Sequence, residues 1–211
     1  MKKVAGKSKA KPNRQARRKE TTRRKLLSAA MEIFGDKGIN DTTVNDITER
    51  ADVAYGTFYN YFTSIEELAP QVIRQKVREH LDEVHAKLAG QKDIVVMVAI
   101  SVRELAKKVL SDRTMHWLSE RPVIMVDELM RSLHDDADAQ HSTGLEAGKF
   151  SLPCSREQMH LFSSWGFTGM LQDGLQNRPV PDDLADAMAR IYLRVLGVKD
   201  SDVAKAIAKA R

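Results

Sequence analysis

TVNDITERADVAYGTFYNYFTSIEEL, residues 43–68, is the stretch that decides the fold of the first part of the chain. Its central ten residues, VAYGTFYNYF, carry no charge, although 30% of the chain is charged. Phe58 and Phe62 are four residues apart and share one face of a helix, and Tyr55 and Tyr59 form a second such pair facing away from it. We therefore expect a short helix with a buried phenylalanine face and an exposed tyrosine face.

A longer helix precedes this stretch. Leu27, Ala30 and Phe34 recur at i, i+3 and i+7, which is the spacing of one helical face. The pattern predicts a first helix that begins near Thr21 and ends before Gly38, a glycine suited to the left-handed position after a helix.

A second, short helix lies between the first helix and the aromatic segment. Thr43 is expected to cap its start, with Asp46 completing a shortened capping box. Val44, Ile47 and Ala51 share one face of this helix. Two short helices joined by a tight turn predict a helix-turn-helix.

The exposed face of the aromatic helix has the chemistry of a DNA-reading surface. The hydroxyls of Tyr55 and Tyr59 and the amide of Asn60 donate hydrogen bonds to phosphates and base edges, and Gly56 permits close approach of a backbone. The alternative is a helix whose aromatic residues only pack against its neighbours. Phe58 and Phe62 are sufficient for that packing. The tyrosines are not needed for it, so their presence favours DNA binding.

The stretch 43–68 resembles the DNA-binding signature of the TetR family of transcriptional regulators, and the preceding FGDKG resembles the end of that family's first helix. The resemblance covers about residues 21–70. It implies a three-helix DNA-binding domain, a helical C-terminal domain that dimerises through its last two long helices, and a small-molecule pocket. It also implies base contacts by Tyr55 and Gly56. The phosphate contacts that it implies are Thr43, Thr57, Tyr59, Asn60 and Tyr61.

The chain departs from the family pattern at three positions. Asp52 stands where a glycine is common, Ala54 where a serine is common, and Ile65 where a lysine is usual. The last two changes remove expected phosphate contacts, and residues 26–70 are acidic. In contrast, residues 1–25 hold twelve Lys or Arg and one acid, Glu20.

The basic N-terminus is open to two interpretations. It is either a solvated, disordered extension or an arm that neutralises DNA phosphates, and the acidity of the next segment favours the arm. The expected divisions are a disordered basic arm at 1–20, a helix-turn-helix domain at 21–66 and a helical effector-binding and dimerisation domain at 67–211. The basic residues expected to contact DNA, in the arm and at the start of the next domain, are Arg17, Arg18, Lys19, Arg23 and Arg24.

The C-terminal part is expected to be helical throughout, which makes the fold class all-α. A strip of small residues lets another helix approach closely, and the resemblance favours a homodimer seam over packing within one subunit. The expected seam residues are Ser163, Gly166, Gly169, Met188, Ile191 and Val195.

A pocket for a small apolar or amphipathic effector is expected in the same domain. Met and Trp side chains suit irregular apolar pockets, although such residues also form ordinary cores. The candidates are Met97, Trp117, Met125, Met130, Phe162 and Trp165.

One polar segment has metal-ligand spacing. His134, Asp138 and His141 stand at i, i+4 and i+7 of a helix. A solvated acidic helix end explains the segment better, so no metal and no cofactor are expected. His160 and the other histidines are scattered, and we expect them at the surface or in the core.

These patterns predict a transcriptional regulator, most simply a repressor that binds a palindromic operator as a homodimer and is released by an effector. No nucleophile elbow, phosphate loop or catalytic carboxylate pair indicates an enzyme. The competing hypothesis is a helical adaptor that binds no DNA. The longest apolar run, IVVMVAI, is too short for a membrane helix, and no secretory signal follows the basic N-terminus, so a cytoplasmic location is expected.

Overall fold

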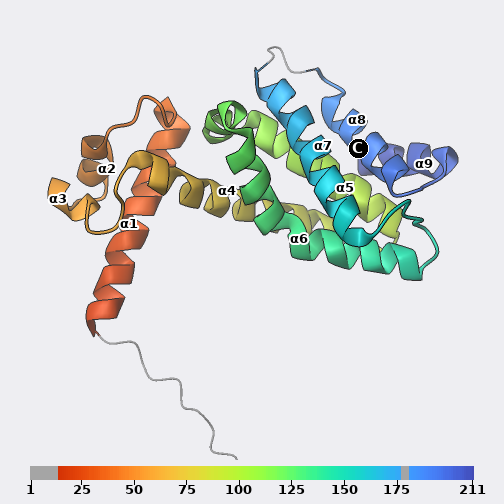
Figure 1. Cartoon of the computed structure of the whole chain (residues 1–211), viewed down its shortest axis with the longest axis horizontal. Coiled ribbons are helices and arrows are strands. Elements are labelled where there is room, and N and C mark those ends of the chain that lie inside the picture. The colour runs from red at the N-terminus through yellow and green to blue at the C-terminus, as the bar shows by residue number, and fades with distance from the viewer. Residues whose placement is uncertain (1–13, 177–180) are drawn as a thin grey trace, which may run out of the picture.

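The chain folds into helices joined by short turns. The computed structural model describes residues 14–176 and 181–211, no strand occurs among them, and the predicted all-α class is confirmed. In chain order the elements are α1 (Arg14–Lys37), α2 (Val44–Arg50), α3 (Tyr55–Phe58), α4 (Ile65–Leu88), α5 (Ile94–Ser111), the 3₁₀ helix η1 (Arg113–Glu120), α6 (Pro122–Glu146), α7 (Arg156–Gln176), α8 (Leu184–Val195) and α9 (Asp200–Ala210). Figure 1 shows α1, α2 and α3 grouped at one end of α4, whose other end enters the bundle of the remaining helices.

The three N-terminal helices close over a small aromatic core. Phe34 of α1, Ile47 of α2 and Phe58 of α3 are fully buried, and Phe62 is 2% exposed. The rings of Phe58 and Phe62 lie 5.7 Å apart between centroids. The phenylalanine face predicted from the i, i+4 spacing therefore lies inside the fold.

The ends of the first two helices follow the predicted cap signals. Gly38 has φ +85° and donates its N–H to the Phe34 carbonyl at 3.0 Å. The Thr43 hydroxyl accepts from Asp46 N at 3.2 Å, and Thr43 N donates to the Asp46 carboxylate at 2.7 Å, which completes the capping box. The Lys37 ammonium binds the same carboxylate at 2.6 Å and is the main cause that lowers the pKa of Asp46 to about 2.

The turn between α2 and α3 is made by a residue in the left-handed region. Asp52 has φ +55°, where a β-carbon is disfavoured. This is the position at which the resemblance leads one to expect a glycine. Asp52 is exposed, so no packing contact compensates for the backbone conformation.

The first helix starts earlier than predicted. Residues 14–20, expected to belong to a disordered arm, form the first two turns of α1, because Ala, Arg, Gln and Lys favour helix and no Gly or Pro interrupts them. Residues 1–13 of the expected arm lie outside the described residues. The first buried side chain is Leu26, so the preceding part of α1 extends about 18 Å beyond the core (Figure 1).

Helix α4 belongs to both halves of the molecule. Its N-cap Ser64 accepts from Glu67 N at 3.4 Å, and the helix has already begun when it reaches Pro70. The buried stripe of α4, which we define as Leu68, Ala69, Val72, Ile73 and Val77, belongs to one core cluster. That cluster begins at Leu26 in α1 and extends to Met188 in α8.

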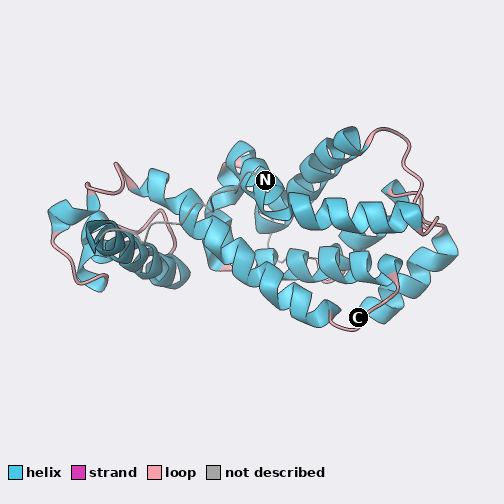
Figure 2. Cartoon of the chain, turned by 90° about the horizontal axis from the view of Figure 1, so that it is seen from below, coloured by secondary structure: helices cyan, strands magenta, loops and turns pink. Residues whose placement is uncertain are grey.

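The C-terminal helices form a layered bundle (Figure 2). Within it, α5 packs against α4, α8 and α9. A buried network of ion pairs and hydrogen bonds joins α5, α8 and the end of α9. Arg103 Nε donates to Asp186 at 2.6 Å, and Arg103 Nη1 donates to Glu104 at 2.7 Å and to the Ala210 carbonyl at 3.0 Å. Arg211 binds the second oxygen of Asp186 at 2.9 Å.

None of the helices in the described ranges combines the length and the apolar character that a membrane crossing requires.

Replacing Asp52 by Gly is expected to raise the free energy of unfolding by about 0.5–1 kcal/mol, because glycine adopts a positive φ without steric cost. Urea denaturation followed by circular dichroism measures the change. Asp52→Ala is the control, since alanine keeps the β-carbon and should lower stability. Equal unfolding midpoints for the two variants would contradict the assigned strain.

Candidate nucleic-acid interface and ligand cavity

Two tyrosines stand on the outer face of α3 and the turn after it. Tyr55 is 53% exposed and Tyr59 is 49% exposed. Their hydroxyl oxygens lie 3.1 Å apart, and their rings pack edge to face with centroids separated by 5.6 Å. The hydrogen bond to Tyr55 raises the pKa of Tyr59, so this phenol is neutral at physiological pH. The pair therefore presents fixed, uncharged hydroxyl groups to solvent.

Gly56 lies beside this pair, and the protein fold itself does not require a glycine there. No heavy atom lies within 4 Å of the position that a β-carbon would occupy, and the backbone does not have a positive φ. A glycine with neither a packing nor a conformational cause leaves room for an external surface to approach the helix.

The other residues predicted to contact DNA differ in their exposure and in the hydrogen bonds they already make. Thr57 is half-buried, Asn60 is exposed, and Tyr61 is half-buried against the core. Thr43 is exposed, but its hydroxyl also lies 2.7 Å from the Asp46 carboxylate in the capping box. Thr43 is thus already engaged in holding the start of α2.

The exposed part of α1 is basic. Arg17, Arg18, Lys19 and Arg24 are all exposed, and no ion pair between residues of the described ranges engages them. Arg23 differs, because its guanidinium binds the Gln71 amide oxygen and lies 5.8 Å from the ring of Phe62. Arg23 therefore ties α1 to α4, a role that sequence reasoning missed.

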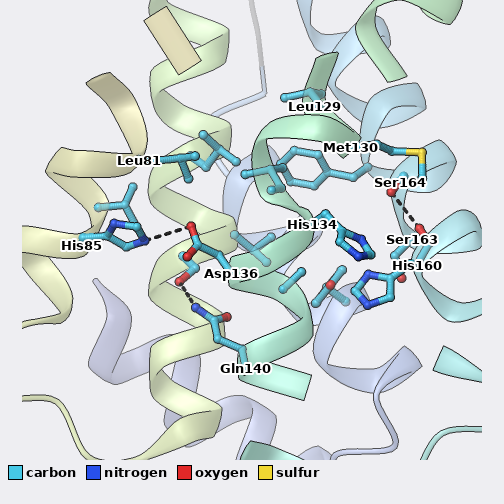
Figure 3. A pocket seen from close by; sticks show the side chains of 18 residues that line it. Leu81, His85, Leu129, Met130, His134, Asp136, Gln140, His160, Ser163 and Ser164 are labelled. Carbon is cyan, nitrogen blue, oxygen red and sulfur yellow. Dashed lines mark hydrogen bonds and ion pairs between the residues drawn. The ribbon is translucent and has the colours of Figure 1, made fainter. Parts of the chain in front are cut away.

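A cavity of about 100 Å³ lies between α4, α5, α6 and α7 (Figure 3). Leu81, Val102, Leu105, Leu129 and Phe167 form much of its apolar wall. Figure 3 shows the rings of His134 and His160 next to each other at one side, with Leu81 and His85 across from them.

Of the six residues predicted for a pocket, Met130 lines this cavity. Met125 is fully buried in the main core, and Met97 packs against the second core cluster around α8 and α9. Phe162 and Trp165 are 65% and 48% exposed, on the outer face of α7.

Trp117 lies at a separate surface recess between η1 and the end of α1, under the guanidinium of Arg121 at 4.2 Å. Met and Trp composition alone does not distinguish a cavity wall from a core or an exposed face.

Three histidines that sequence analysis treated separately come together at the cavity. The ring of His160 lies 5.1 Å from that of His134 and 4.9 Å from that of His141, between centroids. His141 Nε2 is 3.0 Å from the Tyr192 hydroxyl. His141 Nδ1 and His160 Nε2 are buried without a hydrogen-bond partner. Helical spacing placed His134 and His141 on one face of a helix, but nothing in the sequence indicated that His160 of α7 would pack against them.

The three residues with metal-ligand spacing on α6 have different neighbours. Asp138 lies 3.5 Å from His160 Nε2 and 3.5 Å from Arg156 Nη1, so it faces α7. Within 14–176 and 181–211, no group of three or more His, Cys, Asp or Glu side chains is arranged to hold a metal ion.

Two buried side chains at and behind the polar side of the cavity, Tyr192 and His141, are neutral. Burial lowers the pKa of His141 to about 4, helped by the neighbouring His160. Burial also raises the pKa of Tyr192 to about 12. At neutral pH, the His141 imidazole and the Tyr192 phenol are therefore both uncharged.

Two ion pairs join the helices on either side of the cavity. The Arg74 guanidinium of α4 binds both oxygens of Glu128 in α6 at 2.7 Å, and Glu128 is buried. Further along, His85 of α4 lies 3.0 Å from Asp136 of α6. These two contacts fix the spacing of α4 and α6 across the cavity.

An apolar surface remains uncovered on α7 and α8. Phe162, Trp165 and Ile191 are each about half exposed or more. Gly166 and Gly169 have no heavy atom within 4 Å of a built β-carbon. We call these five residues the α7–α8 strip.

Three other predicted seam residues point into their own subunit. Ser163 is 8% exposed and Met188 2% exposed, and Val195 packs partly against the second core cluster. The small size of Ser163 therefore serves packing next to the cavity and not close approach of a second helix.

Comparisons with known proteins agree with this arrangement. Residues 26–72 match the family model described as bacterial regulatory proteins, tetR family. The chain is 34% identical over 80 residues to the uncharacterized HTH-type transcriptional regulator YvdT of Bacillus subtilis, a match covering 38% of this chain and 41% of that protein. It is 38% identical over 52 residues to the HTH-type transcriptional repressor KstR2 of Mycolicibacterium smegmatis, 25% of each chain. The chain thus matches less than half the length of these curated relatives.

Solved structures extend the similarity to the whole fold. RolR in complex with resorcinol superposes with a TM-score of 0.76 at 27% identity, over 92% of this chain and 95% of that one. Thermus thermophilus FadR in complex with lauroyl-CoA gives a TM-score of 0.65 at 24% identity, over 82% and 92% of the two chains. The family resemblance predicted from residues 43–68 is confirmed.

The buried His141 is expected to make stability depend on pH. Between pH 6.5 and about 4 the unfolded chain protonates this imidazole and the folded chain does not, so the free energy of unfolding falls as pH falls, by at most about 3 kcal/mol from this group. Chemical denaturation at pH 6.5, 5.5 and 4.5 measures the fall. His141→Gln should lose less stability over this range than the wild type, and the control Val123→Gln, at an exposed residue of α6 that does not titrate, should follow the wild type. Parallel curves for all three proteins would disprove the assignment.

Proposed function

We propose that the chain, which belongs to the TetR family of bacterial regulatory proteins, is a transcriptional repressor that binds a palindromic operator as a homodimer and releases it when a small-molecule effector occupies the cavity. The observation that carries this proposal is the exposed tyrosine pair beside the open Gly56 on a helix-turn-helix. A regulator of chromosomal genes would act in the cytoplasm.

The tyrosine pair would read the DNA. Tyr55 and Gly56 would face base edges in the major groove, and Tyr59 with Asn60 would face phosphates. The hydrogen bond between the two phenols holds both rings in place before DNA arrives, which lowers the entropic cost of ordering them on binding.

The basic face of α1 would supply the long-range attraction. The helix-turn-helix segment is acidic and lacks a serine at Ala54 and a lysine at Ile65. The exposed Arg17, Arg18 and Lys19 project from the domain on a preformed helix, so each can neutralise a phosphate and displace a counterion.

The α7–α8 strip would be the dimer seam. Large apolar side chains exposed next to open glycines match a helix face that a second helix covers. A two-fold axis through the strip would present two copies of α3 to one duplex, as a palindromic operator requires.

Helix α4 would carry the signal from the effector to the DNA. It lines the cavity with Leu81 and His85, and its N-terminus is joined to α3 by residues 59–64. A ligand that fits better when α4 and α6 are further apart would weaken the Arg74 ion pair with α6 and change the separation of the two recognition helices. The effector acts only through this difference in affinity between two states.

Gly56→Ala is expected to weaken operator binding at least tenfold while leaving the fold intact, because a methyl group occupies the space that the DNA needs. The probe is the promoter region upstream of the chain's own coding sequence, and the measurement is a gel shift at two salt concentrations.

Gly35→Ala is the matched control. Gly35 is also an exposed helical glycine with nothing within 4 Å of its β-carbon position, but it lies on α1 away from the tyrosines. Equal DNA affinity for the two variants would remove Gly56 from the interface. If the wild type binds no duplex at low salt, the helical adaptor becomes the better interpretation.

Trp165→Glu is expected to convert the dimer into a monomer, because a buried charge without a partner opposes the seam. Light scattering after gel filtration should give 23.7 kDa for this variant and twice that mass for the wild type. The control is Val123→Glu, which alters an equally exposed apolar residue on α6. A dimeric Trp165 variant would place the seam elsewhere.

A further inference from the structure

We propose that the cavity recognises an uncharged single-ring phenol, with the ring against the apolar wall and the hydroxyl hydrogen-bonded to His160 Nε2. This inference rests on the proposed function, since it names the chemical class of the effector for the same cavity.

The size and the wall of the cavity select one ring. Its volume is about 100 Å³, and Leu105 and Leu129 in its wall are 4% and 3% exposed. A dry apolar cavity that holds benzene has about 150 Å³, so a single six-membered ring is the upper limit for this smaller space and a long acyl chain is too large for it. Phe167 provides an aromatic surface for ring packing.

Most polar groups at the cavity already have partners inside the protein. Ser164 donates to the His160 carbonyl at 2.7 Å, and the Tyr192 hydroxyl is paired with His141. Gln140 donates to the Ser101 hydroxyl at 3.0 Å. These groups hold the wall in place and are not available as the main partners of a ligand.

His160 Nε2 is different. The residue is 9% exposed, lines the cavity and has no hydrogen-bond partner at this nitrogen. The nearest carboxylate oxygen, on Asp138, is 3.5 Å away and outside hydrogen-bonding geometry. A buried ring nitrogen without a partner is unfavourable, and a ligand hydroxyl that reaches it removes that cost.

The charges around the histidines favour a neutral ligand. No Lys or Arg lines the cavity among the described residues, and the one cation near Asp138 is Arg156, which already faces that carboxylate. A ligand carboxylate would lose its hydration without gaining a cationic partner, and it would approach Asp138. A phenol hydroxyl both donates and accepts, so it can pair with either tautomer of His160.

The experiment is calorimetric titration of the full chain, without DNA, with phenol, toluene and benzoate. Phenol is expected to bind at least tenfold more tightly than benzoate and about tenfold more tightly than toluene. His160→Phe should abolish the preference for phenol over toluene, and His160→Gln should restore part of it. Leu161→Ala alters an exposed residue of the same helix that does not line the cavity, and it should leave the preference unchanged. Thermal unfolding with toluene checks that each variant is folded and keeps its cavity.

Four outcomes would overturn the proposal: benzoate binds as tightly as phenol, the His160→Phe variant keeps the preference, none of the three probes binds, or Zn²⁺ binds stoichiometrically and excludes phenol. The proposed function is tested separately by the gel shift without ligand. DNA binding without phenol binding rejects the ligand class alone, whereas phenol binding without DNA binding rejects the repressor alone.

Discussion

The buried stripe of α4 is the contact on which both halves of the molecule depend. Leu68 and its neighbours pack under the helix-turn-helix, and Val77 packs within the C-terminal bundle, all in one continuous core. Because a close-packed interior does not deform gradually, a shift of α4 has to be shared by both ends of the helix. The Arg74 ion pair with Glu128 sets the position of that helix at the cavity. Under the proposed function, the size of the ligand would set the spacing of α4 and α6 and, through α4, the orientation of the tyrosine pair.

Local chemistry explains why much of the N-terminal domain was predictable. The i, i+4 spacing of Phe58 and Phe62 put them inside and the tyrosines outside, and the caps at Thr43, Ser64 and Gly38 follow from side-chain and backbone preferences within a few residues. The start of α1 was placed too late, because a run of charges was taken as a sign of disorder although its residues are good helix formers.

The cavity was less predictable, since its polar residues come from helices far apart in the sequence. His160 joins His134 only when α6 and α7 pack, and Arg23 meets Gln71 only when α1 packs on α4. Apolar periodicity shows which face of a helix is covered but not what covers it. That is why Phe162 and Trp165, predicted for the pocket, lie on the outer strip, while Met125 lies in the solid core. Metal-ligand spacing on α6 likewise indicated a shared face but not the orientation of the rings.

The network of ion pairs and hydrogen bonds around Arg103 attaches the last turn of α9 to the interior of the bundle. Ends of chains usually fray, but here the Ala210 carbonyl and the Arg211 guanidinium complete the coordination of a buried Arg103–Asp186 pair. Trimming these two positions would leave charges without their full set of partners inside the bundle, with the severity of a core substitution. The Arg211 side chain is itself largely exposed, so a surface position contributes here to the stability of a buried ion pair.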